Sequence, residues 1–264
     1  MTKVKDIFEF LNELAPTTLK MDFDNVGLLV GDGDNEVKKV LVALDITDEV
    51  IDEAVLFGAE LIVSHHPVIF EPLKSVTYAD LNGRKLIKLI KNDISAICMH
   101  TNLDIANGGV NDALMSALGA VTEGYLEYTG TDSLGVKQGC GRIGELKSEV
   151  SLPEFLEKCK TELNANGLRY HDAGLKVKKL AVMGGSGGSS VYLAKELGCD
   201  TYVTSDIKYN CFLDAKELGI NLIDADHFCT ENVIVPVICE KLKNKFPECE
   251  IKISEKHCQT AQFF

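Results

Sequence analysis

Residues 37–67 read VKKVLVALDITDEVIDEAVLFGAELIVSHHP, and residues 177–207 read VKKLAVMGGSGGSSVYLAKELGCDTYVTSDI. The two segments align without a gap, and each reads as an apolar strand, a short loop, a helix, a glycine and a second strand. A third apolar strand follows in each half, at 94–100 and at 220–226. Strands that alternate with helices form mainly parallel sheets. The pattern therefore predicts an α/β protein whose two similar halves arose by duplication.

The rest of the chain is assigned around these two halves. We expect a first lobe over residues 1–125 and a second over 126–264, packed together because no long or low-complexity linker separates them. Residues 130–176 predict a βαβ supplement to the second lobe. Its helix begins near Ser151, where serine, proline and then glutamate are typical of a helix start.

Composition is that of a globular cytoplasmic protein. The 264 residues include 40 acidic and 27 basic side chains, for a net charge of −13. This acidity argues against a nucleic-acid groove, which needs a basic stripe. Nine cysteines without a CxxC pair indicate reduced, mostly buried thiols. Residues 4–14 have the apolar spacing of a helix rather than of a signal peptide, and no window is long enough to span a membrane.

Two adjacent histidines, His65 and His66, stand where the second strand of the first half ends. The carboxyl ends of strands in open α/β sheets are where ligands bind. Neighbouring side chains on an extended chain point in opposite directions. One shared metal ion would therefore require a bend in the chain, whereas two neighbouring ions could take one imidazole each.

Polar residues also follow both third strands, at 100–104 (HTNLD) and at 226–231 (DHFCTE). If the halves share one fold, these clusters lie at equivalent strand ends. His227 and Glu231 are four residues apart, which places them on one face of a helix. Together with Asp104, these donors suit zinc, manganese or iron. His100 is a ligand, a residue that orients a ligand, or a structural residue.

Each of these residues also has a purely structural interpretation. Asp104 could cap the turn that leads to residues 107–109, Glu231 could match the charge of a first helical turn, and Thr230 could cap a helix. For His171 and His257 we favour simple hydrogen bonding, and for Cys229 packing. The three clusters contain four of the six histidines, and this grouping favours a site.

The glycine-rich loop at 184–190 (GGSGGSS) lies between a predicted strand and a predicted helix. Its backbone amides could cradle a substrate phosphate, or the loop could simply make a tight turn. It lacks the lysine of a P-loop. The residues proposed for phosphate contact are Gly185, Ser186, Gly187 and Gly188.

Several motifs occur in order along nearly the whole chain: DNVGLLVGD at 24–32, LVALDIT at 41–47, SHHPVIF at 64–70, HTNLD at 100–104, GGVNDAL at 108–114, GGSGGSS at 184–190 and HFCTE at 227–231. In combination they resemble the NIF-three-like family, whose members are often called GTP cyclohydrolase type-two homologues. The chain departs from many relatives at Phe23, where they have tryptophan, and at Asn210, where they have histidine.

The resemblance implies a dinuclear metal centre with ligands at the matching motif positions. It also implies two similar, intertwined α/β repeats and a ring-shaped homohexamer. At this length, the extra domain that longer relatives carry is expected to be absent. The implied ligands of the two divalent ions (zinc, iron, manganese or similar) are His65, His66, Asp104, His227 and Glu231, with Glu231 as the bridge.

We therefore expect a metal-dependent hydrolase that acts on a phosphorylated or nucleotide-like small molecule, with ring opening of GTP as the named candidate. His65 and His227 would hold one ion, and His66 and Asp104 the other. The alternative is a non-catalytic metal-binding, metal-sensing or scaffold protein, because ligands alone do not show chemistry. The candidates for a catalytic acid or base are Asp45, His100 and Thr101.

Overall fold

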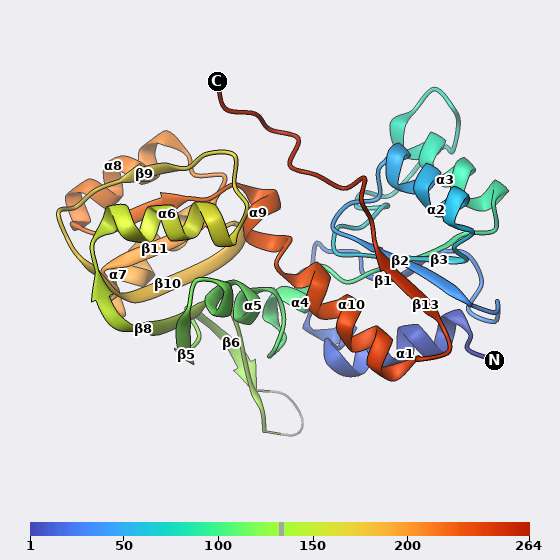
Figure 1. The fold of residues 1–264 in the computed structure, drawn as a ribbon, viewed down its shortest axis with the longest axis horizontal. Coiled ribbons are helices and arrows are strands. Elements are labelled where there is room, and N and C mark those ends of the chain that lie inside the picture. Colours follow the sequence, from blue (N-terminus) through green and yellow to red (C-terminus); the bar gives the residue numbers. More distant parts are fainter. Residues whose placement is uncertain (132–134) are drawn as a thin grey trace. The chain divides into compact units, whose positions relative to one another are not determined.

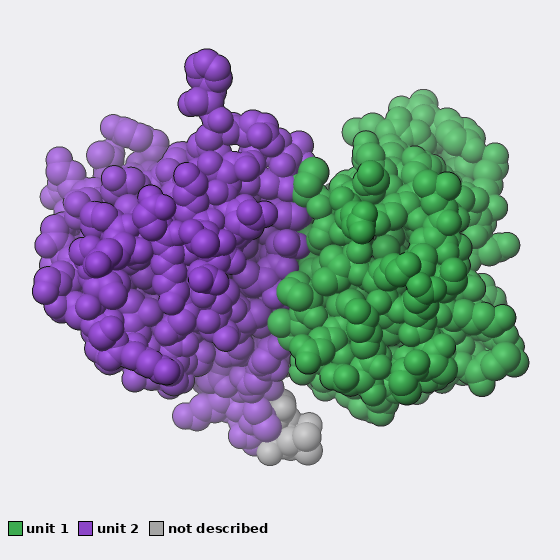
Figure 2. Space-filling view, in the orientation of Figure 1, with its two compact units in different colours: residues 1–103, 235–258 green, residues 104–234, 259–264 purple. Residues whose placement is uncertain are grey.

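The computed structural model describes residues 1–131 and 135–264 as a series of strands and helices (Figure 1). The chain divides into two compact units, which are coloured separately in Figure 2. Unit 1 comprises residues 1–103 and 235–258, and unit 2 comprises residues 104–234 and 259–264. The chain therefore passes between the units at residues 103–104, 234–235 and 258–259.

The two units differ from the predicted lobes, 1–125 and 126–264, in two main segments. Residues 104–125 belong to unit 2, because helix α5 (Val110–Ala117) packs on strands β5 (Ala120–Gly124) and β10 (Val177–Ser186). Residues 235–258 belong to unit 1, because strand β13 (Glu250–Ile253) pairs with β2 (Lys39–Ala43) in parallel. Both segments are placed by contacts that are distant in sequence.

Unit 1 is built around a five-stranded sheet in the order β1-β4-β3-β2-β13. All its neighbours are parallel except β1, which is antiparallel to β4. Helices α2 and α3 cover one face, and α1 and α10 lie on the other (Figure 1). Burial on both faces accounts for the continuous apolar runs of these strands. The remaining elements are α1 (Val4–Leu14), η1 (Thr17–Leu19), β1 (Gly27–Val30), α2 (Asp48–Phe57), β3 (Leu61–Ser64), α3 (Leu81–Lys91), β4 (Ser95–Cys98) and α10 (Ile234–Lys245), while α4 (Thr101–Ile105) ends at the start of unit 2.

Unit 2 contains a six-stranded sheet in the order β5-β8-β10-β11-β12-β9. Strands β10, β11 and β12 are parallel, and the outer strands are antiparallel to their neighbours. Helices α5 and α6 share a core with this sheet. The remaining elements are β6 (Glu127–Thr131), β7 (Lys137–Cys140), β8 (Arg142–Val150), α6 (Leu152–Glu162), β9 (Arg169–His171), η2 (Gly188–Ser190), α7 (Val191–Glu196), β11 (Thr201–Ser205), α8 (Tyr209–Leu218), β12 (Asn221–Asp224) and α9 (His227–Glu231).

The two sheets repeat one pattern, which confirms the predicted α/β fold with mainly parallel and mixed sheets. Val40 pairs with Leu61 in unit 1, and Leu180 pairs with Thr201 in unit 2. Both members of the second pair lie 140 positions beyond those of the first (40 and 180, 61 and 201). An antiparallel strand borders the third strand in each unit, β1 beside β4 and β9 beside β12. Equal register at a constant offset is what a duplication predicts.

Local signals in the sequence act as expected. The Ser151 side chain caps α6, and the Glu154 side chain accepts a hydrogen bond from the backbone N–H of Ser151. Gly58 and Gly198 end α2 and α7 with φ of 73° and 77°. The predicted supplement consists of β8, α6 and β9, and its strands lie beside β10 and β12 in the sheet of unit 2. Residues 132–134, inside the predicted range 130–176, lie outside the described residues.

The cysteines are free, as predicted, and all but Cys258 are buried. Cys229 belongs to the core of unit 2, where burial raises the pKa of its thiol to about 12. This thiol packs in the core of unit 2. In the part of the chain that the structure describes, the helices are too short or too polar to span a bilayer.

Candidate metal centre

The histidine pair of unit 1 lies in a bend and not on an extended strand. Strand β3 ends at Ser64, whose hydroxyl donates to the carbonyl of His66 at 2.8 Å. The His66 amide donates to the carbonyl of Leu44 at 2.9 Å. Because the chain turns here, the alternation of an extended strand does not apply. The ring centroids of His65 and His66 are 5.0 Å apart, and their planes are inclined by 48°.

His100 completes a cluster of three imidazoles in unit 1. It follows β4, and its ring centroid lies 5.2 Å from that of His65 and 5.5 Å from that of His66. Each of the three residues offers one ring nitrogen, and these nitrogens all lie within 4.8 Å of one another. His100 therefore belongs with the pair, an outcome that the sequence left open.

Each of these imidazoles is oriented by a hydrogen bond from Nδ1. His65 Nδ1 lies 2.8 Å from the carbonyl oxygen of Met99, and His66 Nδ1 lies 2.7 Å from an oxygen of Asp45. His100 Nδ1 lies 2.8 Å from an oxygen of Asp24. A carbonyl or a carboxylate can only accept, so Nδ1 is the nitrogen that donates in each of the three rings. Metal-binding histidines in proteins are usually held in this way.

Asp24 is a buried anion, with 5% of its surface exposed. It accepts hydrogen bonds from His100, from the Thr101 amide and from the Thr101 hydroxyl. Burial opposes ionisation, but the hydrogen bonds from His100 and Thr101 outweigh it and hold the pKa of Asp24 well below its usual range. The Thr101 hydroxyl also accepts from the Met21 amide at 3.0 Å. Thr101 is thus part of a structural network, and Asp45 orients His66.

In unit 2, His227 and Glu231 lie on one face of the short helix α9, as their spacing predicts. His227 Nε2 is 3.1 Å from Glu231 Oε2, and Nδ1 is 2.7 Å from Asp206 Oδ2. Burial alone would lower the pKa of His227. Hydrogen bonds to Glu231 and Asp206, together with the negative charges of these two carboxylates, outweigh burial and raise the pKa of His227 to about 9. Asp226 caps α9 and, like Asp206, has a positive φ, at 68° and 52°. Strained residues of this kind cluster at functional sites.

Two buried carboxylates adjoin this imidazole. Glu231 is 3% exposed, Asp104 is also buried, and oxygens of the two lie within 4.8 Å of each other. The buried side chain of Asn111 holds the segment in place. Its Nδ2 donates to the carbonyl of Asp104, and its Oδ1 accepts from the Gly184 amide, both at 2.9 Å. Unit 2 therefore gathers one imidazole and two carboxylates from α4 and α9.

The glycine loop packs against these side chains. Gly185 has a φ of 67°, and a Cβ there would overlap Glu231 Oε1 and lie 3.3 Å from His227 Nε2. Its amide donates to the Thr230 hydroxyl at 3.1 Å, and its carbonyl accepts from the hydroxyls of Thr204 and Ser205. Glycine at 185 is thus explained by its close approach to Glu231. The amides of Gly184 and Gly185 already donate within the protein.

The structural interpretations of single residues are settled in part. The cap of α9 is Asp226 and not Thr230, and Glu231 lies at the end of α9 rather than in a first turn. Asp112, and not Asp104, accepts the Gly108 amide in the turn before α5. His257 is hydrogen-bonded as expected, since its Nδ1 accepts from the Leu44 amide at 3.0 Å.

Asp24 and Asp206 are not among the residues predicted from the sequence, although both orient imidazoles. Asp24 opens the quoted motif DNVGLLVGD, and Asp206 directly follows β11 at its carboxyl end. Position at a strand end was the available signal for Asp206. The amide of Asn210, where many relatives have histidine, contacts Cys211 Sγ at 3.8 Å on the exposed first turn of α8.

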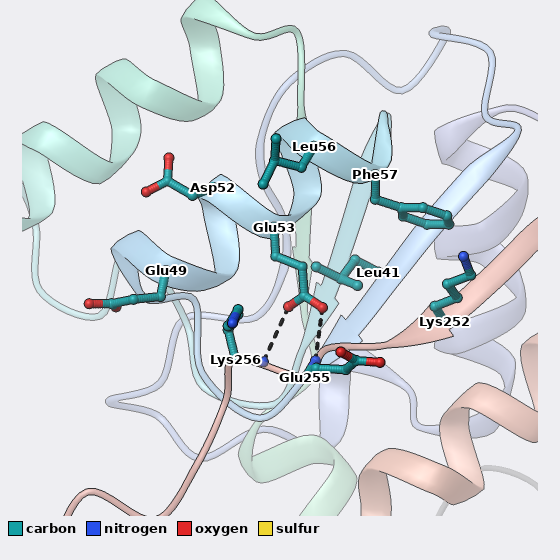
Figure 3. A pocket seen from close by; sticks show the side chains of 9 residues that line it. All are labelled: Leu41, Glu49, Asp52, Glu53, Leu56, Phe57, Lys252, Glu255 and Lys256. Atoms are coloured by element: carbon teal, nitrogen blue, oxygen red, sulfur yellow. Dashed lines mark hydrogen bonds between the residues drawn. The ribbon is translucent and has the colours of Figure 1, made fainter.

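A groove of about 510 Å³ lies elsewhere in unit 1, between α2 and the strands β2 and β13 (Figure 3). Glu53 accepts hydrogen bonds from the backbone amides of Glu255 and Lys256, which ties the chain after β13 to α2. The residues that line this groove include none of the predicted site residues. The groove is therefore separate from the candidate centre.

Comparison with known proteins identifies the family. A family model described as Duf34/NIF3 (NGG1p interacting factor 3) matches residues 2–260. The chain belongs to the Duf34/NIF3 family. This NIF3 chain is 41% identical over 244 residues to a Clostridium perfringens protein named GTP cyclohydrolase 1 type 2 homolog, with 92% of each chain covered. A Lactococcus lactis protein of the same name is 32% identical over 267 residues, with 99% of each covered.

Solved structures agree with this assignment. A Bacillus cereus protein related to NIF3 superposes on this NIF3 chain with a TM-score of 0.92 at 28% identity, and the match covers 100% of both chains. The expected family resemblance is confirmed. The donor set also fits a metal: imidazole nitrogens and carboxylate oxygens are the ligands of zinc, iron and manganese, and both kinds occur among the grouped side chains.

Proposed function

We propose that this chain binds two divalent metal ions through His65, His66, Asp104, His227 and Glu231 and acts as a metal-dependent hydrolase. The observation that carries the proposal is the state of the imidazoles. All three of these histidines donate from Nδ1 to a fixed acceptor, as ligating histidines do. Purely structural histidines have no need for one common orientation.

Glu231 is assigned to both ions as the bridge, and the other four ligands would be shared between the two ions. Glu231 suits that role because it is buried beside an imidazole and a second carboxylate. Divalent ions bound there would act as Lewis acids on a substrate oxygen and on water. Asp45 and Asp206 would keep His66 and His227 in the ligating tautomer.

We propose a phosphorylated or nucleotide-like small molecule as the substrate. The names of the relatives point to GTP. An exposed aromatic pair in unit 1 supports a planar base: Phe23 and Phe70 are 65% and 41% exposed, and their rings meet edge to face at 6.3 Å. The Phe70 ring lies 6.0 Å from that of His100. A phosphate would contact Ser186 to Gly188, because the preceding loop amides already donate to Asn111 and Thr230.

The test uses full-length protein purified without a histidine tag. Elemental analysis should find about two equivalents of zinc, iron or manganese per chain. The loaded protein should hydrolyse GTP or a phosphoester, and Glu231→Gln should abolish turnover while the circular dichroism spectrum is unchanged. His171→Gln, at a histidine outside both clusters, is the matched control and should retain activity. Protein that stays metal-free after incubation with each metal would refute the proposal.

The second candidate is a binding protein without turnover. The matching family is described as an NGG1p interacting factor, which is the name of a protein that interacts with another. Tight, reversible metal binding without turnover across GTP and a broad panel of phosphoesters would favour this candidate. Turnover by the wild type that is lost in Glu231→Gln would favour the hydrolase.

We propose a homohexamer in the cytoplasm as the working assembly. The support is the family assignment, together with free, mostly buried cysteines of the kind that reducing compartments keep. Light scattering coupled to size exclusion should give six times the chain mass of 28.8 kDa. A monomeric mass at micromolar concentration would refute the ring.

A further inference from the structure

We infer that Arg142 is a positioning residue, which holds the proposed metal ligand Asp104 in place through the backbone. This inference rests on the proposed metal centre, because it concerns how one ligand of that centre is fixed. It adds a residue whose side chain contacts neither the metal nor a substrate. Arg142 and Asp104 both belong to unit 2.

The segment that carries Asp104 has little rigidity of its own. Helix α4 is five residues long, and a helix this short is not stable by itself. The turn that follows contains Gly108, with a φ of 73°, and Gly109, and glycine leaves the backbone many conformations. A functional side chain has to be held within about 0.5 Å of its productive position. Contacts from outside the segment must therefore supply that precision.

Arg142 supplies such contacts at both ends of the turn. Its Nη2 donates to the carbonyl of Ala106 at 3.0 Å, two residues beyond Asp104. Its Nε and Nη2 donate to the two carboxylate oxygens of Asp112 at 3.0 and 2.9 Å. The residue before Asp112 is Asn111, which donates to the carbonyl of Asp104. The guanidinium therefore fixes the backbone on both sides of the turn.

The guanidinium is fully hydrogen-bonded where it lies. Its Nη1 donates to the carbonyls of Gly139 and Gly141 at 2.7 and 2.9 Å, so all five N–H groups of Arg142 have an acceptor. The side chain is 1% exposed, and its strand β8 is paired on both sides, with β5 and with β10. An ion pair with Asp112 needs only two of the five donors. The other three join the turn to the residues just before and at the start of β8, as a clamp between segments would.

Lysine at this position would separate the charge from the geometry. An ammonium group retains the positive charge for Asp112, but its three donors share one nitrogen, and it lacks the planar fork of arginine. Arg142→Lys can therefore keep an ion pair while it loses the simultaneous contacts with Ala106 and with Gly139 and Gly141.

The experiment titrates metal-free, full-length protein with cobalt, followed by calorimetry and by visible absorption, which reports the number and the kind of ligands. We expect Arg142→Lys to weaken at least one of the two equivalents by about 10- to 100-fold, as the loss of a residue that supports a metal ligand does. In an Asp104→Asn background the same substitution should have no further effect, because Arg142 acts through Asp104. Asp112→Asn breaks the clamp from its more exposed side and should also weaken binding, and it decides the question if Arg142→Lys does not fold.

Two controls separate positioning from a general loss of stability. Arg84→Lys alters another Arg–Asp pair, with Asp48 in unit 1, and should leave the cobalt affinity unchanged. Phe155→Leu leaves a cavity in the core of unit 2 and lowers the Tm, but removes none of the hydrogen bonds of Arg142, so it should also leave the affinity unchanged. Circular dichroism verifies the fold of each variant.

The outcomes separate this inference from the proposed function. If the wild type binds two ions, and Arg142→Lys and Asp112→Asn bind them as tightly, the role of Arg142 is refuted and the dinuclear centre stands. An equal loss with and without Asp104, or a loss that Phe155→Leu reproduces, refutes that role as well. If the wild type binds a single ion that Arg142→Lys weakens only while Asp104 is present, the inference stands and the dinuclear centre fails. A wild type that binds no metal refutes both.

Discussion

Gly185→Ala tests whether the glycine loop exists to admit the Glu231 carboxylate. Gly185 has a φ of 67°, and the new Cβ would overlap Glu231 Oε1. The carboxylate must move or the loop must shift, and either change disturbs the pair that Glu231 makes with His227 at 3.1 Å. The matched control is Gly219→Ala, with a φ of 62° and nothing within 4 Å of its Cβ. Both glycines have a positive φ, but only the Cβ at 185 would overlap another side chain.

The magnitudes follow from these two effects. Alanine in the left-handed region costs about 1–2 kcal/mol, of which the stiffer unfolded chain returns about 0.4–1 kcal/mol. Gly219→Ala should therefore lose about 1 kcal/mol, or about 2–4 °C in Tm for a chain of this size. Gly185→Ala should lose about 1–3 kcal/mol more, because buried side chains must move to admit the methyl group.

The assay combines thermal unfolding of the metal-free protein with cobalt titration. Gly185→Ala should melt below Gly219→Ala and bind at least one equivalent of cobalt less tightly, whereas Gly219→Ala should bind as the wild type does. If both variants have the same Tm and the same cobalt affinity, then the close approach of Gly185 to Glu231 has no role in the metal centre. Glycine at 185 would then need another explanation.

Four further predictions use the same protein. Asp206→Asn should weaken metal binding by about 10- to 100-fold, because the amide holds Nδ1 of His227 less firmly; an unchanged affinity would contradict its orienting role. Since the pKa of His227 is raised to about 9, metal must displace a proton there, so affinity from competition titrations should fall as the pH is lowered from about 9 to 6. Burial lowers the pKa of His257, so its unfolded state takes up a proton near pH 6.5 before the folded state does. The free energy of unfolding should therefore fall as the pH drops below about 6.5, and His257→Gln should flatten that dependence in urea titrations. Phe70→Ala should weaken GTP binding about tenfold, whereas the control Tyr78→Ala should leave GTP binding unchanged. Equal effects of the two substitutions would argue against stacking of the base on Phe70.

The parts of the fold that follow from local physics could be predicted from the sequence. The side chains of Ser151 and Glu154 accept hydrogen bonds from the first backbone amides of α6. Four consecutive residues therefore determine where that helix begins. Gly58 and Gly198 end their helices because few other residues adopt the left-handed conformation easily. The spacing of His227 and Glu231 fixes one face of α9, and the 3.1 Å contact follows from helix geometry.

The remaining features depend on contacts that no local pattern encodes. Strand β13 joins unit 1 beside β2, some 200 positions earlier in the sequence, and pairing of this kind is decided by packing of the whole unit. The turn of His65 and His66 to one side depends on the Ser64 hydroxyl and on a carbonyl at Leu44. The role of Asp24 requires His100 to lie beside it, 76 positions later.

The two halves share one framework of strands and helices, but equivalent positions in the two halves have different roles. At the constant offset of 140, Asp45 corresponds to Gly185 and His66 to Asp206. In unit 1 the position after the second strand holds the proposed ligand, and Asp45 orients it; in unit 2 the equivalent position holds Asp206, which orients a ligand supplied by α9. The absence of a side chain at 185 leaves room for the Glu231 carboxylate. Duplication thus supplied the strand ends, and divergence at these few positions made one half rich in imidazoles and the other in carboxylates.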